Sequence, residues 1–402
     1  MQLGAMRLGI IALLFGYIMS QFYRACLAVL TPVLETEIGA SATDLSFASG
    51  LWFLTFAVMQ FPVGWSLDKY GPRLTASVML MIGGGGGAAI FAVATSPLHV
   101  QIAMAFIGIG CAPVLMASYF IFARAFPAAM FATLGGTLIG IGTMGNLASA
   151  APLAMAASAF GWRESLWALT FITAIIAASI WFFVKDPEAP KSNTDDNVQN
   201  GTDGFITIFK IPALWLIAPL LFFSYASAAG LRGLWAGPYM QQIFLLDSSG
   251  IGLVTLAMGA GMSVGSFLYG PLDRIFKTRK WVIIVGNAGT FLSLIGLSFW
   301  PNLGVATATI LLSLVGVFGM SYPLMMAHGR SFIPQHLTGR GVSMLNLCSI
   351  AGVGSMQALS SIAYRWGAEQ NIETGYQTLF LFFALPLFLS LLIYVFSQDR
   401  LD

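Results

Sequence analysis

Charged residues are scarce in this sequence: aspartate, glutamate, lysine and arginine make up only 8% of its 402 residues. Soluble globular domains carry roughly a quarter of their residues as charges, so the composition excludes an ordinary soluble enzyme or binding module. What fills the chain instead is apolar, because 57% of the residues are hydrophobic. A chain of this length and composition is expected to cross a membrane many times.

Cysteine and histidine are equally rare, with three of each. The cysteines have no CxxC spacing and fall in apolar stretches, so we expect neither a disulfide nor a metal site; they are Cys26, Cys111 and Cys348. The histidines are expected in or near loops; they are His99, His328 and His336. An intramembrane enzyme would need a Ser-His pair, a histidine cluster or paired carboxylates within the bilayer. The sequence offers none, so we expect no catalytic residues and no cofactor.

Long apolar runs define the fold class. A membrane-spanning helix needs roughly 20 mostly apolar residues, and the runs between charged breaks predict an all-α membrane protein with twelve spans. The predicted spans are 8–34, 45–67, 74–96, 100–123, 128–158, 165–184, 211–240, 248–271, 281–300, 303–327, 341–364 and 375–397.

The basic residues predict how the chain is oriented. With both termini in the cytoplasm, fourteen of the eighteen lysines and arginines fall on the inner side and only Arg163 and Arg365 on the outer side. This asymmetry follows the positive-inside rule, and it favours a plasma membrane such as the bacterial inner membrane. Because topology accounts for the basic residues, they do not indicate a nucleic-acid partner.

The chain divides into two halves with a polar seam. Residues 186–209 form the longest polar stretch, rich in Asp, Asn and Pro, and predict a cytoplasmic linker between a six-helix bundle at 1–185 and another at 210–402. Landmarks recur between the halves: Asp68 corresponds to Asp273 at an offset of 205. A parallel duplication of this kind is a known transporter plan.

The stretch GWSLDKYGPRL after the second span carries a family resemblance. It resembles the signature loop of the major facilitator superfamily, Gly-x-x-x-Asp-(Arg/Lys)-x-Gly-x-(Arg/Lys), and GPLDRIFKTRK after the eighth span resembles a degenerate second copy. The resemblance covers the whole chain and implies a transporter with two pseudo-symmetric six-helix bundles that can work as a monomer. It also implies a gating role for the loop residues, namely Gly64, Asp68, Gly71, Arg73, Asp273 and Arg279.

The chemistry of the loop can be argued from its residues alone. Gly64 allows two helices to approach closely, and Gly71 permits a tight turn. Asp68 can accept charge-assisted hydrogen bonds, either from Arg73 or from the N-terminus of another helix. Such contacts would latch one side of the molecule.

Two arginines lie inside otherwise uncharged spans. Arg24 is in the first span and Arg232 in the seventh, at an offset of 208. A bare guanidinium in a membrane costs at least a few kcal/mol, and all sixteen acidic residues can be placed outside the predicted spans. An unpaired buried charge requires compensation from water or a ligand, and arginine pairs carboxylate or phosphate bidentately. We therefore expect both arginines to bind an anionic substrate.

The resemblance adds that the first and seventh spans line the central cavity and face each other, so the two arginines would converge on one site. The placement is similar to that of organophosphate and organic-anion carriers. Neighbouring polar residues are candidates for orienting the substrate; they are Gln21, Tyr23, Asn146, Tyr225, Trp235, Tyr239 and Gln242.

The function expected is transport of a small organic anion, a carboxylate or phosphorylated metabolite, by alternating access. Proton-driven porters commonly use a carboxylate inside the membrane, and its absence here favours anion exchange or facilitated diffusion. Alternatives are an inorganic oxyanion such as nitrate, a zwitterion such as a short peptide, and a receptor that binds without transport. Besides its substrate, the chain is expected to contact membrane lipid.

Overall fold

The structure is a computed structural model that describes residues 2–187 and 203–401, and every described element is helical. Three short segments differ from α-helix: η1 and η2 are π-helical turns, and η3 is a 3-10 turn. The elements in chain order are α1 (Gln2–Ile38), α2 (Ala42–Val58), α3 (Gln60–Met79), η1 (Leu80–Gly85), α4 (Gly86–Ala92), α5 (Pro97–Ala125), α6 (Ala128–Gly142), α7 (Met144–Ala148), α8 (Ala151–Phe160), α9 (Trp162–Phe183), α10 (Asp203–Phe209), α11 (Pro212–Gly230), η2 (Leu231–Trp235), α12 (Ala236–Phe244), α13 (Ser248–Phe276), α14 (Lys280–Phe299), α15 (Val305–Phe318), α16 (Tyr322–Arg330), η3 (Gln335–Leu337), α17 (Thr338–Ala368) and α18 (Ile372–Tyr394).

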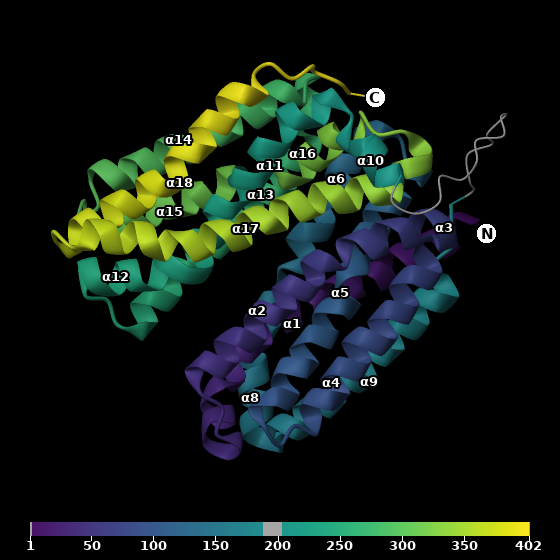
Figure 1. The fold of residues 1–402 in the computed structure, drawn as a ribbon, viewed down its shortest axis with the longest axis horizontal. Helices are drawn as coiled ribbons and strands as arrows, with labels where there is room; N and C mark the ends of the chain where they lie inside the picture. Colours follow the sequence, from purple (N-terminus) through teal and green to yellow (C-terminus); the bar gives the residue numbers. More distant parts are fainter. Residues whose placement is uncertain (1, 188–202, 402) are drawn as a thin grey trace. The chain divides into compact units, whose positions relative to one another are not determined.

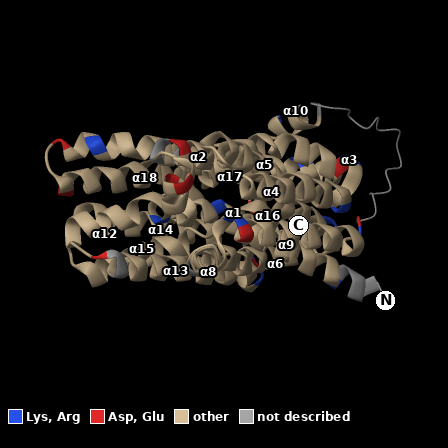
Figure 2. Cartoon of the chain, turned by 90° about the horizontal axis from the view of Figure 1, so that it is seen from below, with Lys and Arg blue, Asp and Glu red and all other residues tan. Residues whose placement is uncertain are grey.

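The predicted membrane architecture is confirmed. Within the described residues, eleven helical stretches are long and apolar enough to cross a membrane, and a shorter apolar helix covers Phe47–Val58. In Figure 2 the helices are uncharged over most of their length. Outward-facing side chains are apolar as well, and Phe182 is 76% exposed. Exposed apolar surface of this extent is stable only in contact with lipid.

The second and third spans meet differently from the expected loop. α2 and the start of α3 together form the second span, and the helix is interrupted by a kink at Gly71 before the rest of α3 begins the third span. Gly71 has φ +84°, a conformation that glycine adopts without a Cβ clash. Pro72 follows at a helix start, where its missing N–H costs nothing. The predicted loop is therefore a turn centred on one residue.

The predicted linker at 186–209 lies mostly outside the described residues. Its last part is described and forms the short helix α10, whose residues Gly204 and Phe205 lie against Arg340.

The chain divides into two compact units. Unit 1 comprises Met1–Phe126, Ile141–Ile206 and Pro334–Met344, and unit 2 comprises Pro127–Gly140, Thr207–Ile333 and Leu345–Asp402. Unit 1 therefore contains the start of α17, and unit 2 contains most of α6. In Figure 1, where the colours follow the sequence, α6 has the blue of the first half of the chain and α17 the yellow-green of the second half.

Glycines permit both of these helix packings. A Cβ on Gly64 of α3 would lie 2.9 Å from the Cα of Arg340 of α17. A Cβ on Gly270 of α13 would lie 2.9 Å from the Cα of Thr133 of α6. In each case only a residue without a side chain lets the backbones approach so closely.

In unit 1, α1 packs against α5, α7 and α9, and η1 lies against α5. The glycine run in η1 serves helix packing, as its position inside a span indicates. A Cβ on Gly110 of α5 would overlap the backbone nitrogen of Gly84. In unit 2, α14 packs between α15 and α18, and α11 contacts α16 and α18.

Candidate functional site

Arg24 lies near the middle of α1 in unit 1, where it is half-buried. Its guanidinium carbon is 5.4 Å from the ring centroid of Trp52 and 5.1 Å from that of Phe53, both on α2. One N–H reaches the Gln21 side-chain oxygen at 3.5 Å, while the buried Nε has no hydrogen-bond partner. Aromatic faces attract a cation but leave its hydrogen-bond donors unused. Arg24 therefore has donors available for an anion.

Arg232 lies in η2, the π-helical turn between α11 and α12 in unit 2. Such turns interrupt α-helices and frequently occur at functional sites. The Arg232 guanidinium lies on Gly259 of α13, where a Cβ would be 3.0 Å from Nη2 and 3.1 Å from Nε. Its Nε is buried without a hydrogen-bond partner. The missing side chain at residue 259 thus provides the space for the guanidinium.

Neither arginine has an acidic partner among the described residues. The ion pairs within 4.0 Å involve Arg124, Arg163, Arg279 and Arg340 instead. Carboxylates within the long apolar helices lie near helix ends, as Glu37 does, or close to the Gly71 turn, as Asp68 does. In the part of the chain that the structure describes, no carboxylate lies within 4.0 Å of either Arg24 or Arg232.

The polar neighbours of Arg24 mostly bond within unit 1. The fully buried Tyr23 hydroxyl is 2.8 Å from Thr173 Oγ1 of α9, a contact that ties α1 to α9. Gln21 donates to the Tyr17 hydroxyl at 2.8 Å. Asn146 is half-buried on α7, a helix that packs against α1.

The polar neighbours of Arg232 also bond within their own unit. Trp235 donates from its indole nitrogen to Ser360 Oγ at 2.8 Å. The Tyr239 hydroxyl donates to the carbonyl oxygen of Pro301. Gln242 accepts from two tyrosine hydroxyls near the end of α12. Tyr225 packs on the Tyr322 ring at 5.8 Å. Among these residues Tyr225 is the half-buried one on the helix that leads into η2.

Asp68 lies at the N-terminus of α17. Of the two partners that the sequence predicts for it, Arg73 and the N-terminus of another helix, the structure shows the helix. Its carboxylate accepts from the backbone N–H of Gly339 at 2.7 Å and of Arg340 at 3.1 Å. The Arg340 guanidinium is 3.7 Å away and that of Arg124 3.9 Å away. A helix N-terminus and two cations together stabilise the buried carboxylate.

Arg73, the other predicted partner of Asp68, contacts Trp181 and Asp186 instead. Its guanidinium carbon is 4.7 Å from the ring centroid of Trp181 on α9, and its backbone N–H donates to the Asp186 carboxylate at 2.9 Å. That carboxylate lies against Gly71, where a Cβ would overlap it. The loop therefore bonds α17 through Asp68 and the end of α9 through Arg73.

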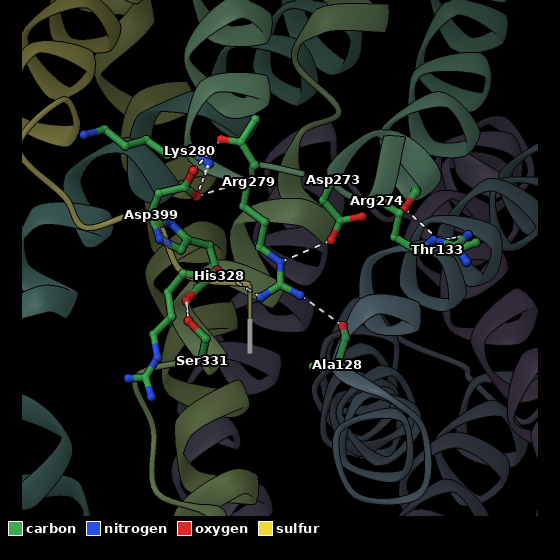
Figure 3. A network of polar contacts seen from close by, with 12 residues as sticks. Ala128, Thr133, Asp273, Arg274, Arg279, Lys280, His328, Ser331 and Asp399 are labelled. Carbon is green, nitrogen blue, oxygen red and sulfur yellow. Dashed lines mark hydrogen bonds and ion pairs between the residues drawn. The ribbon is translucent and has the colours of Figure 1, made fainter. Parts of the chain in front are cut away.

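The second copy of the loop forms a corresponding network in unit 2 (Figure 3). Asp273 accepts from Nε of the buried Arg279 at 3.2 Å, and Arg279 also donates to the Ala128 carbonyl oxygen of α6 at 3.0 Å. Arg274 donates to Thr133 Oγ1 of α6 at 3.1 Å. In this copy the arginines Arg274 and Arg279, rather than Asp273, bond to α6, a helix from the first half of the sequence.

His328 is a buried polar residue whose contacts the sequence did not indicate. It lies in the last turn of α16, near a loop as predicted, yet it is fully buried. Its Nδ1 is 2.7 Å from the Tyr394 hydroxyl, and its Nε2 is 2.8 Å from the Gln398 carbonyl oxygen. A histidine between a hydroxyl and a carbonyl fits the neutral imidazole. Its partners come from a segment 66 residues later, so no local pattern could identify them.

Among the described residues, no group of three or more His, Cys, Asp and Glu side chains could hold a metal ion.

The sequence-family and structural comparisons agree with this architecture. The family model of the major facilitator superfamily matches residues 13–235 and 217–401. The chain belongs to the major facilitator superfamily. Its members are transporters rather than enzymes, and the fold class and family expected from the sequence are confirmed.

Two solved structures of the superfamily share the fold. The Escherichia coli fucose:proton symporter covers 98% of this chain and all of its own, at 16% identity and a TM-score of 0.74. A proton:xylose symporter covers 98% of this chain and 96% of its own, at 14% identity and a TM-score of 0.75.

Curated relatives within the superfamily are distant. A protein described as a probable sulfoacetate transporter of Cupriavidus necator is 25% identical over 77% of this chain and 75% of its own. The hexuronate transporter of Bacillus subtilis is 23% identical over 68% of each chain. An uncharacterised transporter of the same bacterium is 24% identical over 98% of this chain and 94% of its own.

Proposed function

We propose that this superfamily member transports a small organic anion, with Arg24 and Arg232 as its anion-binding residues. The observation that carries the proposal is the same in both units. Each contains one arginine inside an apolar helix, with a buried Nε and no carboxylate within 4.0 Å among the described residues. A charge kept there at a cost of at least a few kcal/mol is best explained by an anionic ligand.

The relatives support an organic anion. Sulfoacetate and hexuronates, named for two of the relatives, are both organic acids. A carboxylate or sulfonate presents two or more oxygens to the planar guanidinium fork. We propose the same chemical class for this chain, carried by alternating access as an exchanger or a facilitative carrier.

The gating residues follow from the same proposal. Asp68 with Arg340 would hold the N-terminus of α17 in one state and release it in another. Asp273 with Arg279 would do the same for the N-terminus of α6. The charge bias of the sequence supports cytoplasmic termini and a bacterial inner membrane. We propose that a monomer is sufficient for transport.

Thermal unfolding of the purified protein across a panel of ligands tests the proposal. The panel contains carboxylates, sulfonates, phosphate esters, nitrate, neutral sugars and dipeptides. We expect stabilisation by organic anions alone, and binding about tenfold or more weaker in Arg24→Ala and in Arg232→Ala, since a hydrogen bond to a charged group contributes about 1.5–3 kcal/mol.

Two further variants serve as controls. Arg163→Ala removes an arginine that is paired with Glu37 and should leave anion binding unchanged. Arg232→Lys keeps the charge but loses the bidentate fork and should bind with intermediate affinity. Stabilisation by neutral sugars that persists in both alanine variants would refute the anion assignment.

A further inference from the structure

An apolar groove lies on unit 2 between the end of α13, the start of α14 and the end of α15. Its walls include Leu268 and Phe276 of α13, Trp281 and Val285 of α14, and Phe318 of α15. Four of these side chains are half or more exposed, namely Leu268, Phe276, Trp281 and Val285. The lining is almost entirely apolar, so it suits a hydrocarbon chain better than a polar ligand.

The floor of the groove is closed by one tyrosine. Tyr269 is 4% exposed and donates its hydroxyl hydrogen to the Phe318 carbonyl oxygen at 3.0 Å. It fits beside α14 because residue 286 is glycine, where a Cβ would overlap the Tyr269 hydroxyl. The hydroxyl is thereby satisfied inside the protein, and the ring presents an apolar floor. The groove is thus a formed feature of the packing.

Two lysines border the end of the groove where α13 meets α14. Thr278 lines the groove, and Lys277 and Lys280 flank it in the connecting turn. The Lys280 ammonium is 5.8 Å from the ring centroid of Trp281, which is itself a groove wall. Lys277 is exposed. Neither lysine has a carboxylate within 4.0 Å among the described residues.

The nearby carboxylates are already engaged by other groups. Asp273 is 1% exposed and paired with Arg279. Asp399 accepts from the Thr278 hydroxyl and from the backbone N–H groups of Arg279 and Lys280 at 3.1 Å. In Figure 3 the Lys280 side chain extends away from Asp399. The positive charge at this end of the groove is therefore available to an external anion.

We infer that the groove binds one acyl chain of an anionic phospholipid, with the lipid phosphate at Lys277 and Lys280. The apolar lining matches the chain, and the two ammonium groups, which have no carboxylate within 4.0 Å among the described residues, match the headgroup. Lysines at the end of a membrane helix lie at the depth of lipid phosphates. A zwitterionic lipid would fill the groove with less electrostatic attraction, and a free phosphate would lack the chain.

Quenching of Trp281 fluorescence by brominated lipids tests this inference. The full-length protein is placed in nanodiscs in which either phosphatidylglycerol or phosphatidylcholine carries the bromine atoms on its chains. The signal of Trp281 is the difference between the wild type and Trp281→Phe. We expect brominated phosphatidylglycerol to quench Trp281 at lower mole fractions than brominated phosphatidylcholine.

Removing the lysines should abolish that preference. Each lysine near an anionic lipid contributes a factor of about five in binding, so Lys277→Ala and Lys280→Ala should each raise the half-quenching mole fraction about fivefold. Lys210→Ala, an exposed lysine of unit 2 away from the groove, should leave it unchanged.

A second measurement separates the lipid from its parts. Thermal unfolding in detergent should rise with added phosphatidylglycerol, and glycerol phosphate at the same concentration should have no effect. Equal quenching by both brominated lipids, or a response to glycerol phosphate, would overturn the inference. Because glycerol phosphate is itself a small organic anion, this measurement is made on the Arg24→Ala Arg232→Ala double variant, so its outcome is independent of the anion-binding proposal.

Discussion

At the scale of single residues, Arg24 and Arg232 contrast with Arg279, a fully buried arginine of unit 2. Arg279 is 2% exposed, pairs with Asp273 and donates to the carbonyl oxygens of Ala128 and Arg400. Its charge and donors are satisfied inside the protein, which is the requirement for a structural buried ion. Arg24 and Arg232 lack such a set among the described residues, which makes them the candidates for ligand binding.

Gly259 should control how well Arg232 binds an anion. Alanine there would place a Cβ 3.0–3.2 Å from the guanidinium and displace it slightly, and valine would displace it further. We expect Gly259→Val to bind the stabilising anion about tenfold more weakly, with Gly259→Ala in between. Both affinities can be measured by titration of the thermal shift.

Gly252→Ala is the matched control, since it lies on the same helix with nothing within 4 Å of its added Cβ. Gly252→Ala should stabilise α13 by about 0.5–1 kcal/mol through helix propensity, whereas at residue 259 the close contact of the added Cβ with the guanidinium opposes that gain. Unchanged anion affinity in Gly259→Val would show that residue 259 does not position Arg232. That result would leave the role of Arg232 itself intact if Arg232→Ala still loses binding.

At the scale of elements, helix ends carry much of the polar structure. The N-terminus of α17 is capped by Asp68 from α3, far away in sequence. The N-terminus of α14 is capped by Asp399, which follows α18. In both cases a remote carboxylate satisfies N–H groups that the helix itself cannot pair. Tertiary caps of this kind make the helix starts depend on distant segments.

The cap at Asp399 should give the protein a defined acid sensitivity. Partial burial raises the pKa of Asp399, but hydrogen bonds from Thr278, Lys280 and Arg279 outweigh it and hold the pKa below its usual range. A lowered folded-state pKa means that the contribution to stability is fully present above the ordinary carboxyl pKa of about 4 and is lost as the pH falls through the folded-state value.

Asp399→Asn keeps an acceptor oxygen but removes the negative charge, so it should lower the melting temperature at pH 7 by an amount equivalent to about 0.3–1 kcal/mol. The difference from the wild type should shrink as the pH is lowered from 5 to 3. The measurement is thermal unfolding at a series of pH values. A difference that stays constant over this range would contradict a role for the carboxylate charge.

At the scale of the whole molecule, the two units contain matching parts. Each has an arginine without an acidic partner among the described residues, one copy of the signature loop, and the start of a helix from the other half of the sequence. The duplicated plan that the sequence predicts would produce such a repetition. If the protein carries an anion, as we propose, the substrate would neutralise the charges of Arg24 and Arg232, which the empty protein would have to bury uncompensated.

Exchange should consequently be faster than net flux. Vesicles containing the protein and loaded with unlabelled substrate should take up the labelled anion several-fold faster than unloaded vesicles, because the empty carrier changes state slowly. Vesicles with Arg232→Ala should show neither process. Net efflux that outpaces exchange would argue against neutralisation as the condition for the conformational change.

Much of this protein could be predicted without a structure, because the deciding quantities are local. The number of spans follows from hydrophobic length, and the exceptional status of Arg24 and Arg232 follows from the cost of charge in lipid. The turn at Gly71 and the close approach at Gly64 were likewise predictable from residue type. For Asp68 the sequence left two partners open, Arg73 and the N-terminus of another helix, and the structure shows the second.

The tertiary structure alone decided which partners are used. It selected α17 rather than Arg73 for Asp68, placed Arg232 in a π-helical turn against Gly259, and joined His328 to Tyr394. It also placed the starts of α6 and α17 with the other half of the chain. The physical reason is that length and charge act on each segment separately, whereas these contacts require the backbones of segments far apart in sequence to approach within a few ångströms.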